Sequence, residues 1–190
     1  MKSVFKLVFP TLEYKEKAID YINEFNAYES EINGSGALDE YLGQFGYEEW
    51  IDKIQKEIDI ANIQEPNVPK LTYFYVREDD DKIIGMINIR LALNEELRKE
   101  GGHIGYSVRP TERKKGYATD MLELGVQVCN KIGIEEVLVA CDKSNIASVS
   151  VIKNCGGKLK EEFYSNTYGE SIQMYVINSL GGNKWKIENC

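Results

Sequence analysis

The chain has 190 residues and a mass of 21.7 kDa, a length typical of one domain with a substantial core. Its 23 basic and 31 acidic residues give a formal net charge of −8, which disfavours a nucleic-acid binder that depends on a basic surface. Hydrophobic residues make up 43% of the chain, so a wholly disordered protein is excluded.

Cysteine and histidine usage argues against a metal site. The four cysteines, at positions 129, 141, 155 and 190, form no C-x-x-C pair, and His103 is the only histidine. The N-terminal apolar stretch is interrupted by Lys6 and lacks the apolar core of a secretory signal. No segment approaches the roughly 20 apolar residues that a membrane span needs. We therefore expect a cytoplasmic protein with reduced thiols and no membrane partner.

The first 70 residues read mainly as helical. Residues 3–9 predict a short strand, and a helix is expected after Pro10. Apolar residues at helical spacing mark that helix, namely Ala18, Tyr21, Ile22 and Phe25. After a glycine-rich loop at 33–36, a second amphipathic helix is marked by Trp50, Ile54, Ile58 and Ala61.

The pattern changes to strands at residue 71. Residues 71–77 and 83–93 predict an antiparallel hairpin, with an acidic turn between them that we interpret as solvated. Residues 103–108 predict another strand, and residues 118–132 repeat apolar side chains at helical spacing. The continuous apolar run at 137–141 is typical of a central strand, so strand, helix and strand follow in βαβ order.

The remaining residues complete an α/β domain. Residues 145–155 predict a short helix that Gly156 and Gly157 end, and residues 158–177 predict a closing hairpin. Residues 179–190 read as a loosely docked tail with Trp185 as its only large anchor. We find no linker, so one domain over 1–190 is expected.

The most informative segment is 108–119, where the predicted strand leads into the long helix. It carries four cations against one carboxylate in an acidic chain. A helix N-terminus presents unpaired N–H groups and the positive end of a dipole, which together can bind a phosphate. Gly116 allows close approach of the backbone, and the small Ala118 leaves room beside it. The bare pattern also fits a solvated basic turn before an ordinary helix.

The segment lacks the P-loop and dinucleotide-binding glycine patterns. It resembles the acetyl-CoA pyrophosphate loop of the GNAT (GCN5-related N-acetyltransferase) superfamily, with signature [QR]-x-x-G-x-[GA] after a strand ending in V-x-P. Arg113, Gly116 and Ala118 occupy the signature positions. Asn145-x-x-Ser148 follows at the family's spacing, and the resemblance covers about residues 71–178. The strings G-H-I-G-Y-S-V-R-P and C-D-K-x-N-I-A-S look like a branch of bacterial acetyltransferases.

The resemblance implies a mixed, strongly twisted sheet, mostly antiparallel and flanked by about four helices. A central parallel pair, 103–109 and 137–141, would splay to admit the pantetheine of acetyl-CoA, the implied co-substrate. The expected cofactor-binding residues are Val108, Arg113, Lys114, Lys115, Gly116, Tyr117, Ala118, Thr119, Asn145 and Ser148. Asn145 can also act as a helix cap.

The implied reaction is direct attack of a primary amine on acetyl-CoA in a ternary complex. It needs a neutral amine, a donor that polarises the thioester carbonyl, and a proton for the departing thiolate. A backbone N–H near Ser107 or Val108 is the expected donor. Many family members carry a tyrosine acid seven residues after the asparagine, where this chain has Ile152.

Three residues are therefore candidates for acid–base catalysis. They are Tyr106, His103 and Tyr164, and each also fits a packed or cleft-lining side chain. Cys155 lies on an apolar helix face and is expected to be an inert thiol.

Two alternatives remain open at this stage. The donor could be another short acyl-CoA, or the protein could be a non-catalytic CoA-binding sensor or interaction module. The acceptor is expected to be a small-molecule or peptide amine, and the acidic composition favours a cationic one. A homodimer is left open.

Overall fold

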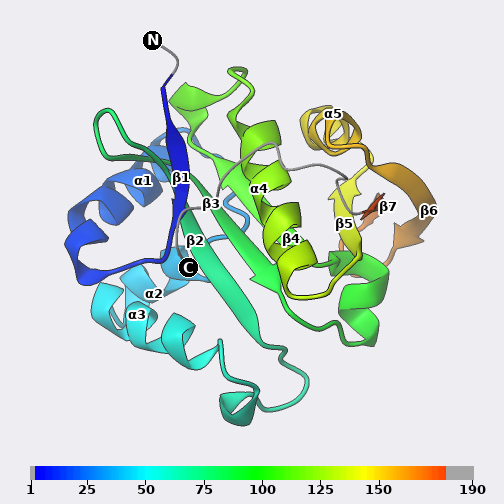
Figure 1. Ribbon diagram of the computed structural model, residues 1–190, viewed down its shortest axis with the longest axis horizontal. Coiled ribbons are helices and arrows are strands. Elements are labelled where there is room, and N and C mark those ends of the chain that lie inside the picture. The colour runs from blue at the N-terminus through cyan, green and yellow to red at the C-terminus, as the bar shows by residue number, and fades with distance from the viewer. Residues whose placement is uncertain (1–2, 179–190) are drawn as a thin grey trace.

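The computed structural model describes residues 3–178, and its strands form two antiparallel sheets (Figure 1). The first sheet has the order β1-β2-β3-β4 and the second β5-β7-β6. The strands of the first sheet are β1 (Phe5–Val8), β2 (Lys70–Arg77), β3 (Lys82–Arg90) and β4 (Ile104–Val108). The strands of the second are β5 (Glu136–Asp142), β6 (Lys158–Ser165) and β7 (Glu170–Asn178). The expected tail at 179–190 lies outside the described residues.

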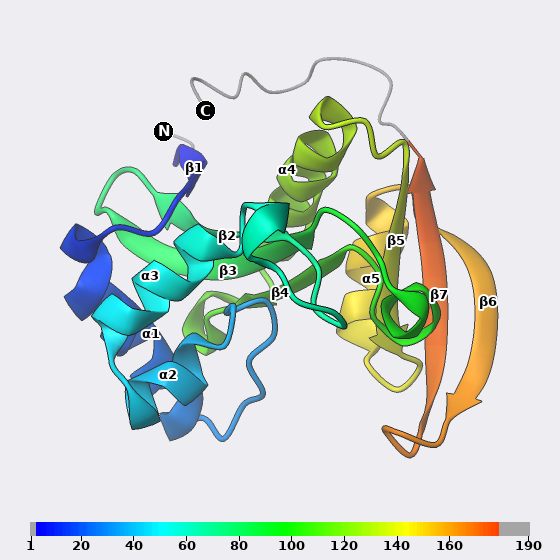
Figure 2. The same cartoon turned by 90° about the horizontal axis from the view of Figure 1, so that it is seen from below.

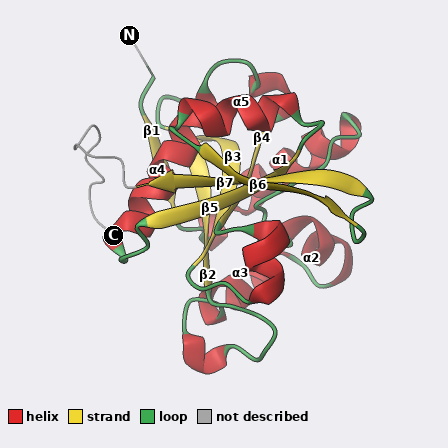
Figure 3. Cartoon of the chain, turned by 90° about the vertical axis from the view of Figure 1, so that its right-hand side faces the viewer, coloured by secondary structure: helices red, strands yellow, loops and turns green. Residues whose placement is uncertain are grey.

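Helices cover both sides of the strands, as Figure 3 shows from the β5–β7 end. The α-helices are α1 (Lys15–Ala27), α2 (Leu38–Gln44), α3 (Tyr47–Lys56), α4 (Tyr117–Lys131) and α5 (Ile146–Asn154). Short 3-10 turns occupy Leu12–Tyr14, Ile60–Asn62 and Pro110–Glu112, and a π-helical turn occupies Leu97–Gly101. Within the described residues, no helix is long and apolar enough to span a membrane.

The predicted elements are largely confirmed, and their bounds differ in places. The seven-residue α2 was not predicted, because it is too short to show helical periodicity. Helix α3 ends at Lys56, so Ile58 is 40% exposed and Ala61 lies in a 3-10 turn instead of on a buried helix face. Strand β3 ends at Arg90, three residues earlier than predicted.

Two core clusters hold the layers together. One packs α1–α3 against β2 and β3, and its members from α1 are the predicted stripe of Ala18, Tyr21, Ile22 and Phe25. The other packs α4 and α5 against both sheets, around Leu122 and Val139. Figure 2 shows α1–α3 and the β5–β7 sheet at opposite ends of the molecule, with β2–β4 between them. The mixed α/β fold with a mostly antiparallel sheet is thus confirmed.

The two sheets are joined at one end only. Gly102 forms an isolated bridge with Val139, and the His103 N–H donates to the Leu138 carbonyl at 2.7 Å. A Cβ on Gly102 would lie 2.5 Å from the Leu138 carbonyl oxygen, so this contact requires glycine. Within residues 3–178, β4 and β5 form no continuous ladder. The single sheet expected from the sequence is therefore divided at the strand pair that was predicted to splay. The parallel pairing expected there is not formed within the described residues, and the Gly102–Val139 bridge is antiparallel.

Candidate active site

The loop between β4 and α4 leaves a row of backbone donors unpaired. Lys114 (φ +64°) and Gly116 (φ +86°) adopt left-handed conformations, and Gly116 precedes the first turn of α4 without a side-chain cap. Within the described residues, the N–H groups of residues 114–118 form no hydrogen bond. Successive free N–H groups at a helix N-terminus form a concave site for an anion such as a phosphate. This is the segment that the sequence predicted to bind pyrophosphate.

The Arg113 side chain fastens this loop to the rest of the domain. Its Nε donates to the Val108 carbonyl at 3.0 Å, and an Nη donates to Ser30 Oγ at 2.7 Å. The guanidinium also lies 5.5 Å from the centre of the Phe25 ring. Arg113 was predicted to bind the cofactor, and the structure shows that its donors already serve to shape the loop.

The neighbouring lysines differ in their partners. Lys115 Nζ lies 2.7 Å from a carboxylate oxygen of the buried Glu112, which Arg77 also contacts at 3.3 Å. Although burial opposes it, the hydrogen bond from Lys115 and the charge of Arg77 hold the pKa of Glu112 below its usual value. Lys114 is exposed and takes part in no ion pair with the described residues.

A cavity of about 290 Å³ occupies the gap between β4 and β5. Strands β4 and β5 and the start of α5 contribute part of its lining, namely Ile104, Gly105, Tyr106, Ala140, Cys141, Asn145 and Ser148. Arg109 donates its N–H to the Ile84 carbonyl at 2.9 Å, on the β3 side. Because antiparallel ladders alternate, the N–H groups of Tyr106 and Val108 point away from β3, toward the gap.

The structure brings three of the predicted site residues together. The Tyr106 hydroxyl and Ser148 Oγ lie 3.0 Å apart, so a hydrogen bond crosses the gap from β4 to α5. Asn145 Oδ1 accepts the Ser148 N–H at 3.0 Å, which is the helix-cap role that the sequence allowed. Burial raises the pKa of Tyr106, so its hydroxyl stays protonated and can act as a donor.

The other two acid–base candidates lie elsewhere. The buried His103 accepts the Leu138 N–H through Nδ1 at 2.9 Å, within the contact that joins the sheets. Burial and the charges of Arg98 and Arg90 lower the pKa of His103 to about 4, so the ring is neutral at pH 7. Tyr164 is 62% exposed on β6 and does not line the cavity.

Two further residues lie where the sequence placed them. Ile152 is fully buried in the core and does not face the cavity. Cys155 is also buried, and its Sγ contacts the Thr119 carbonyl at 3.6 Å. Burial raises the pKa of the Cys155 thiol to about 12, which keeps it protonated.

Sequence reasoning missed the remaining lining of the cavity. It is lined by Glu31, Asn33, Arg90, Glu100, Gly101, Asp142, Tyr168 and Ile172. These residues come from the α1–α2 segment, β3, the π-helical turn, β5 and the β6–β7 hairpin, so no single motif contains them. Only Asp142 gave a usable signal, because it directly follows the apolar run of a strand predicted to border the cleft.

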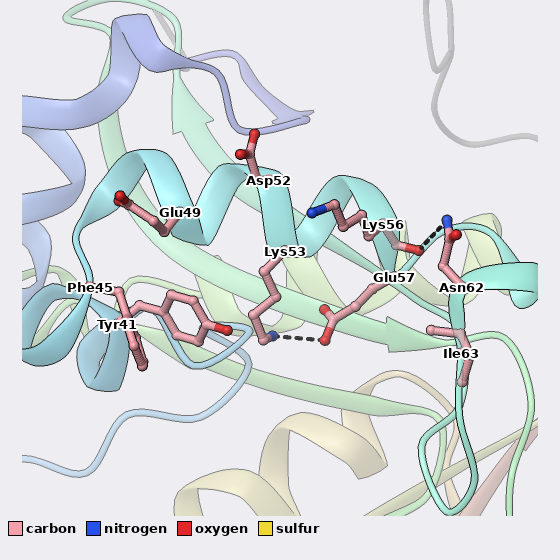
Figure 4. Close-up of a pocket in the computed structure, with 9 residues that line it drawn as sticks. All are labelled: Tyr41, Phe45, Glu49, Asp52, Lys53, Lys56, Glu57, Asn62 and Ile63. Carbon is pink, nitrogen blue, oxygen red and sulfur yellow. Dashed lines mark hydrogen bonds and ion pairs between the residues drawn. The ribbon is translucent and has the colours of Figure 1, made fainter.

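A second pocket, of about 450 Å³, lies on the outer surface of α2 and α3 (Figure 4). Tyr41 and Phe45 border one end of it, and the Lys53–Glu57 ion pair, at 2.8 Å, crosses it. None of the residues predicted from the sequence lines this pocket, so we base the site on the β4–β5 gap. Within the described residues, no group of three or more His, Cys, Asp or Glu side chains could hold a metal ion.

A family model described as the acetyltransferase (GNAT) domain matches residues 24–158. The chain belongs to the GNAT acetyltransferase family. The match includes β4, the β4–α4 loop, α4 and β5, which together form the site described above. No relative was found among curated proteins.

Solved structures share the GNAT fold at low sequence identity. MccE, the microcin C7 self-immunity acetyltransferase in complex with acetyl-CoA and AMP, is 19% identical over 92% of both chains, with a TM-score of 0.61. RimL, a ribosomal L7/L12 alpha-N-protein acetyltransferase in complex with coenzyme A, is 16% identical over 93% of this chain and 95% of its own, with a TM-score of 0.65. A dodecameric spermidine N-acetyltransferase from Vibrio cholerae is 14% identical over 93% of both chains, with a TM-score of 0.56.

Proposed function

We propose that this GNAT protein transfers acetyl from acetyl-CoA to a primary amine by direct attack in a ternary complex. One observation carries the proposal: the loop with free N–H groups continues directly from β4, whose unpaired edge borders the cavity. The loop that we propose to bind phosphate is thus adjacent to a strand with free N–H donors. A long cofactor with a phosphate and an amide-bearing arm requires this arrangement. The solved neighbours MccE and RimL contain acetyl-CoA and coenzyme A, which supports the choice of cofactor.

The cofactor would bind along this path. The N–H groups of residues 114–118 would hold its pyrophosphate, with Lys114 and Lys115 adding positive charge and Thr119 closing the first turn of α4. The backbone of Val108 would bind the pantetheine arm from the free edge of β4. Asn145 and Ser148 would contact the arm from the opposite wall.

The transfer step requires donors at the thioester. The N–H of Tyr106 or Val108 would polarise the carbonyl, and the Tyr106 hydroxyl would protonate the departing thiolate. Cys155 is buried and protonated, so an acyl-enzyme at that thiol is disfavoured. Of the three acid–base candidates, Tyr106 fits best, because His103 is bound to Leu138 and Tyr164 lies outside the cavity.

The amine class of acceptor is supported by the neighbours. RimL is an alpha-N-protein acetyltransferase, and the Vibrio cholerae enzyme is a spermidine N-acetyltransferase. Enzymes with this fold thus acetylate amines of different kinds. The free thiols of Cys129, Cys141 and Cys155 fit a reducing compartment, and we propose the cytoplasm. A CoA-binding sensor is the second candidate, because the family's usual acid position holds the buried Ile152.

Thiol-release kinetics test the proposal directly. The protein is mixed with acetyl-CoA and a panel of amines, and calorimetry measures acetyl-CoA binding in parallel. Amine-dependent thiol release supports the transferase. Tight binding of acetyl-CoA without release for any amine establishes the sensor instead, and no binding overturns both.

A further inference from the structure

The cavity between β4 and β5 contains charges of both signs that are not paired with each other. Its lining includes Arg90, Glu31 and Asp142. Among residues 3–178, no ion pair includes any of these three. Arg90 and Asp142 are partly removed from water, and a charge in that position is costly when no opposite charge compensates it. The arrangement therefore points to a ligand that supplies the missing charges.

Arg90 provides the positive end. One Nη donates to the carbonyls of Gly101 and Gly102, at 3.3 and 2.9 Å, which leaves the Nε and the other Nη without a partner in the described residues. Burial lowers the pKa of Arg90. Glu100 lines the same cavity, but its carboxylate contacts Ser165 Oγ at 3.1 Å and Lys99 at 3.9 Å instead.

Glu31 and Asp142 provide the negative end. Asp142 is the last residue of β5, and Glu31 belongs to the segment between α1 and α2. Their charges interact: burial, Glu170 and Glu31 together raise the pKa of Asp142. Two carboxylates that line one cavity and form no ion pair with the described residues are complementary to an ammonium group.

The segment that carries Glu31 is fixed against β4. Ser107 Oγ donates to the Asn33 carbonyl at 2.7 Å. A Cβ on Gly34, whose φ is +76°, would lie 2.3 Å from the Gly105 carbonyl oxygen, so the backbones meet closely there. The contacts of Asn33 and Gly34 with β4 thus hold Glu31 at the cavity.

The positive and negative ends lie apart along the strands. Arg90 is bonded to Gly102, at the end where the sheets are joined through Val139. Asp142 is three residues beyond Val139 on β5, which corresponds to roughly 10 Å of strand at about 3.3 Å per residue. Arg90 therefore lies toward the joined end of the cavity, and Asp142 toward its open end.

We propose that the acceptor is a zwitterionic amine, a small molecule with both a carboxylate and an ammonium group. Its carboxylate would bind Arg90, and its ammonium would bind Asp142 and Glu31. This inference rests on the proposed acetyl transfer. In that reaction the ammonium first loses one proton to solvent, and the amine nitrogen then attacks the thioester carbon. The N–C bond forms, the C–S bond breaks, and the second nitrogen proton leaves as the thiolate is protonated.

Matched pairs of acceptors test the carboxylate requirement. Each pair is an amino acid and its carboxamide, namely glycine and glycinamide, 4-aminobutanoate and 4-aminobutanamide, and 6-aminohexanoate and 6-aminohexanamide. We expect kcat/KM to favour the acid of at least one pair by tenfold or more. In Arg90→Gln this acid-to-amide ratio should fall to about one, because only the acid loses a charged partner. The exposed Arg98, outside the cavity, provides the control Arg98→Gln, which should keep the wild-type ratio.

The carboxylates are tested with the same pairs. Asp142→Asn and Glu31→Gln should raise KM for acid and amide alike, about tenfold or more, without changing their ratio. Because the acid-to-amide ratio is measured within one variant, partial unfolding cannot imitate the fall expected for Arg90→Gln. A wild-type ratio of one or less for every pair, or a ratio that Arg90→Gln leaves unchanged, overturns the proposal.

A binding measurement separates this proposal from the proposed function. Calorimetry titrates each acid and amide into the protein saturated with coenzyme A. If no amine is acetylated but an acid binds in an Arg90-dependent manner, acetyl transfer is wrong and the zwitterion site stands. If amines are acetylated but no acid binds better than its amide, the transferase stands and the zwitterion site is wrong.

Discussion

At the residue scale, Tyr106 is the side chain whose chemistry we expect to matter most. Its hydroxyl lies 3.0 Å from Ser148 Oγ at the cavity, and burial raises its pKa, so it donates rather than accepts a proton at pH 7. Tyr106→Phe should lower kcat by about 100-fold, since loss of a positioned acid typically costs 10²–10⁴-fold. Calorimetry should show nearly unchanged affinity for acetyl-CoA.

The comparison variant for this test is Tyr164→Phe. Tyr164 is exposed on β6, so removing its hydroxyl should leave kcat near the wild-type value. A normal kcat in Tyr106→Phe would make ordered water, with backbone polarisation, the better account of proton transfer.

Replacing Cys155 tests whether the enzyme forms a covalent intermediate. The thiol is buried and its pKa is raised to about 12 by burial, so the nucleophilic thiolate is scarce at neutral pH. Cys155→Ala should keep most activity. Intact-mass measurement of the wild-type protein with acetyl-CoA alone should detect no stable acetyl adduct, and an adduct on Cys155 that the acceptor discharges would instead establish a ping-pong mechanism.

His103 should make stability depend on pH in a defined window. Its pKa is about 4 in the folded protein, against 6.5 when unperturbed, because burial disfavours the charged ring. Between these values the unfolded chain binds a proton that the folded chain does not, so the free energy of unfolding falls as pH drops from 6.5 toward 4. The shift corresponds to up to about 3 kcal/mol.

Urea unfolding at pH 7.5 and pH 4.5 measures this dependence. His103→Gln has no proton to gain and should show a smaller loss between the two pH values than the wild-type protein. Equal losses in both proteins would show that carboxylates, not His103, cause the acid sensitivity.

At the scale of elements, the two ends of α4 offer a matched pair of glycines. Gly116 (φ +86°) precedes the helix and Gly133 (φ +89°) follows it, and a Cβ on either would meet no atom within 4 Å. Valine should strain the backbone similarly at both positions. Gly116→Val should weaken acetyl-CoA binding at least tenfold, because the side chain would enter the phosphate site.

Gly133→Val is the control for this prediction. It should show a comparable loss of stability in thermal unfolding, with acetyl-CoA affinity unchanged in calorimetry. If both variants bind acetyl-CoA as the wild-type protein does, the loop is not the phosphate site.

Long elements were predictable from the sequence because their apolar spacing matches their burial. The α1 stripe that ends at Phe25 and the apolar strand around Val139 are examples. Short or irregular elements were not, since α2 has only seven residues and the π-helical turn Leu97–Gly101 is polar. The signature at Arg113 located the loop, but not the contacts that this side chain makes.

At the scale of the whole molecule, the limit of sequence reasoning was the assembly of distant segments. The cavity takes Glu31, Arg90 and Asp142 from three elements that are separated by 50 residues or more along the chain. Periodicity places each residue on its own element, but it carries no information on which loops meet. The sequence also left open which face of β4 meets which partner. The structure directs Tyr106 toward α5 and Ser107 toward the α1–α2 segment.

The guanidinium of Arg113 connects β4 to the segment between α1 and α2. Arg113 donates to the Val108 carbonyl, on the strand that borders the gap, and to Ser30 Oγ, next to Glu31. A ligand that shifts the β4–α4 loop therefore also displaces the segment around Glu31. Such coupling is reciprocal, because each ligand must change the affinity of the other by the same factor. The affinities for cofactor and acceptor would thus depend on each other, whichever binds first.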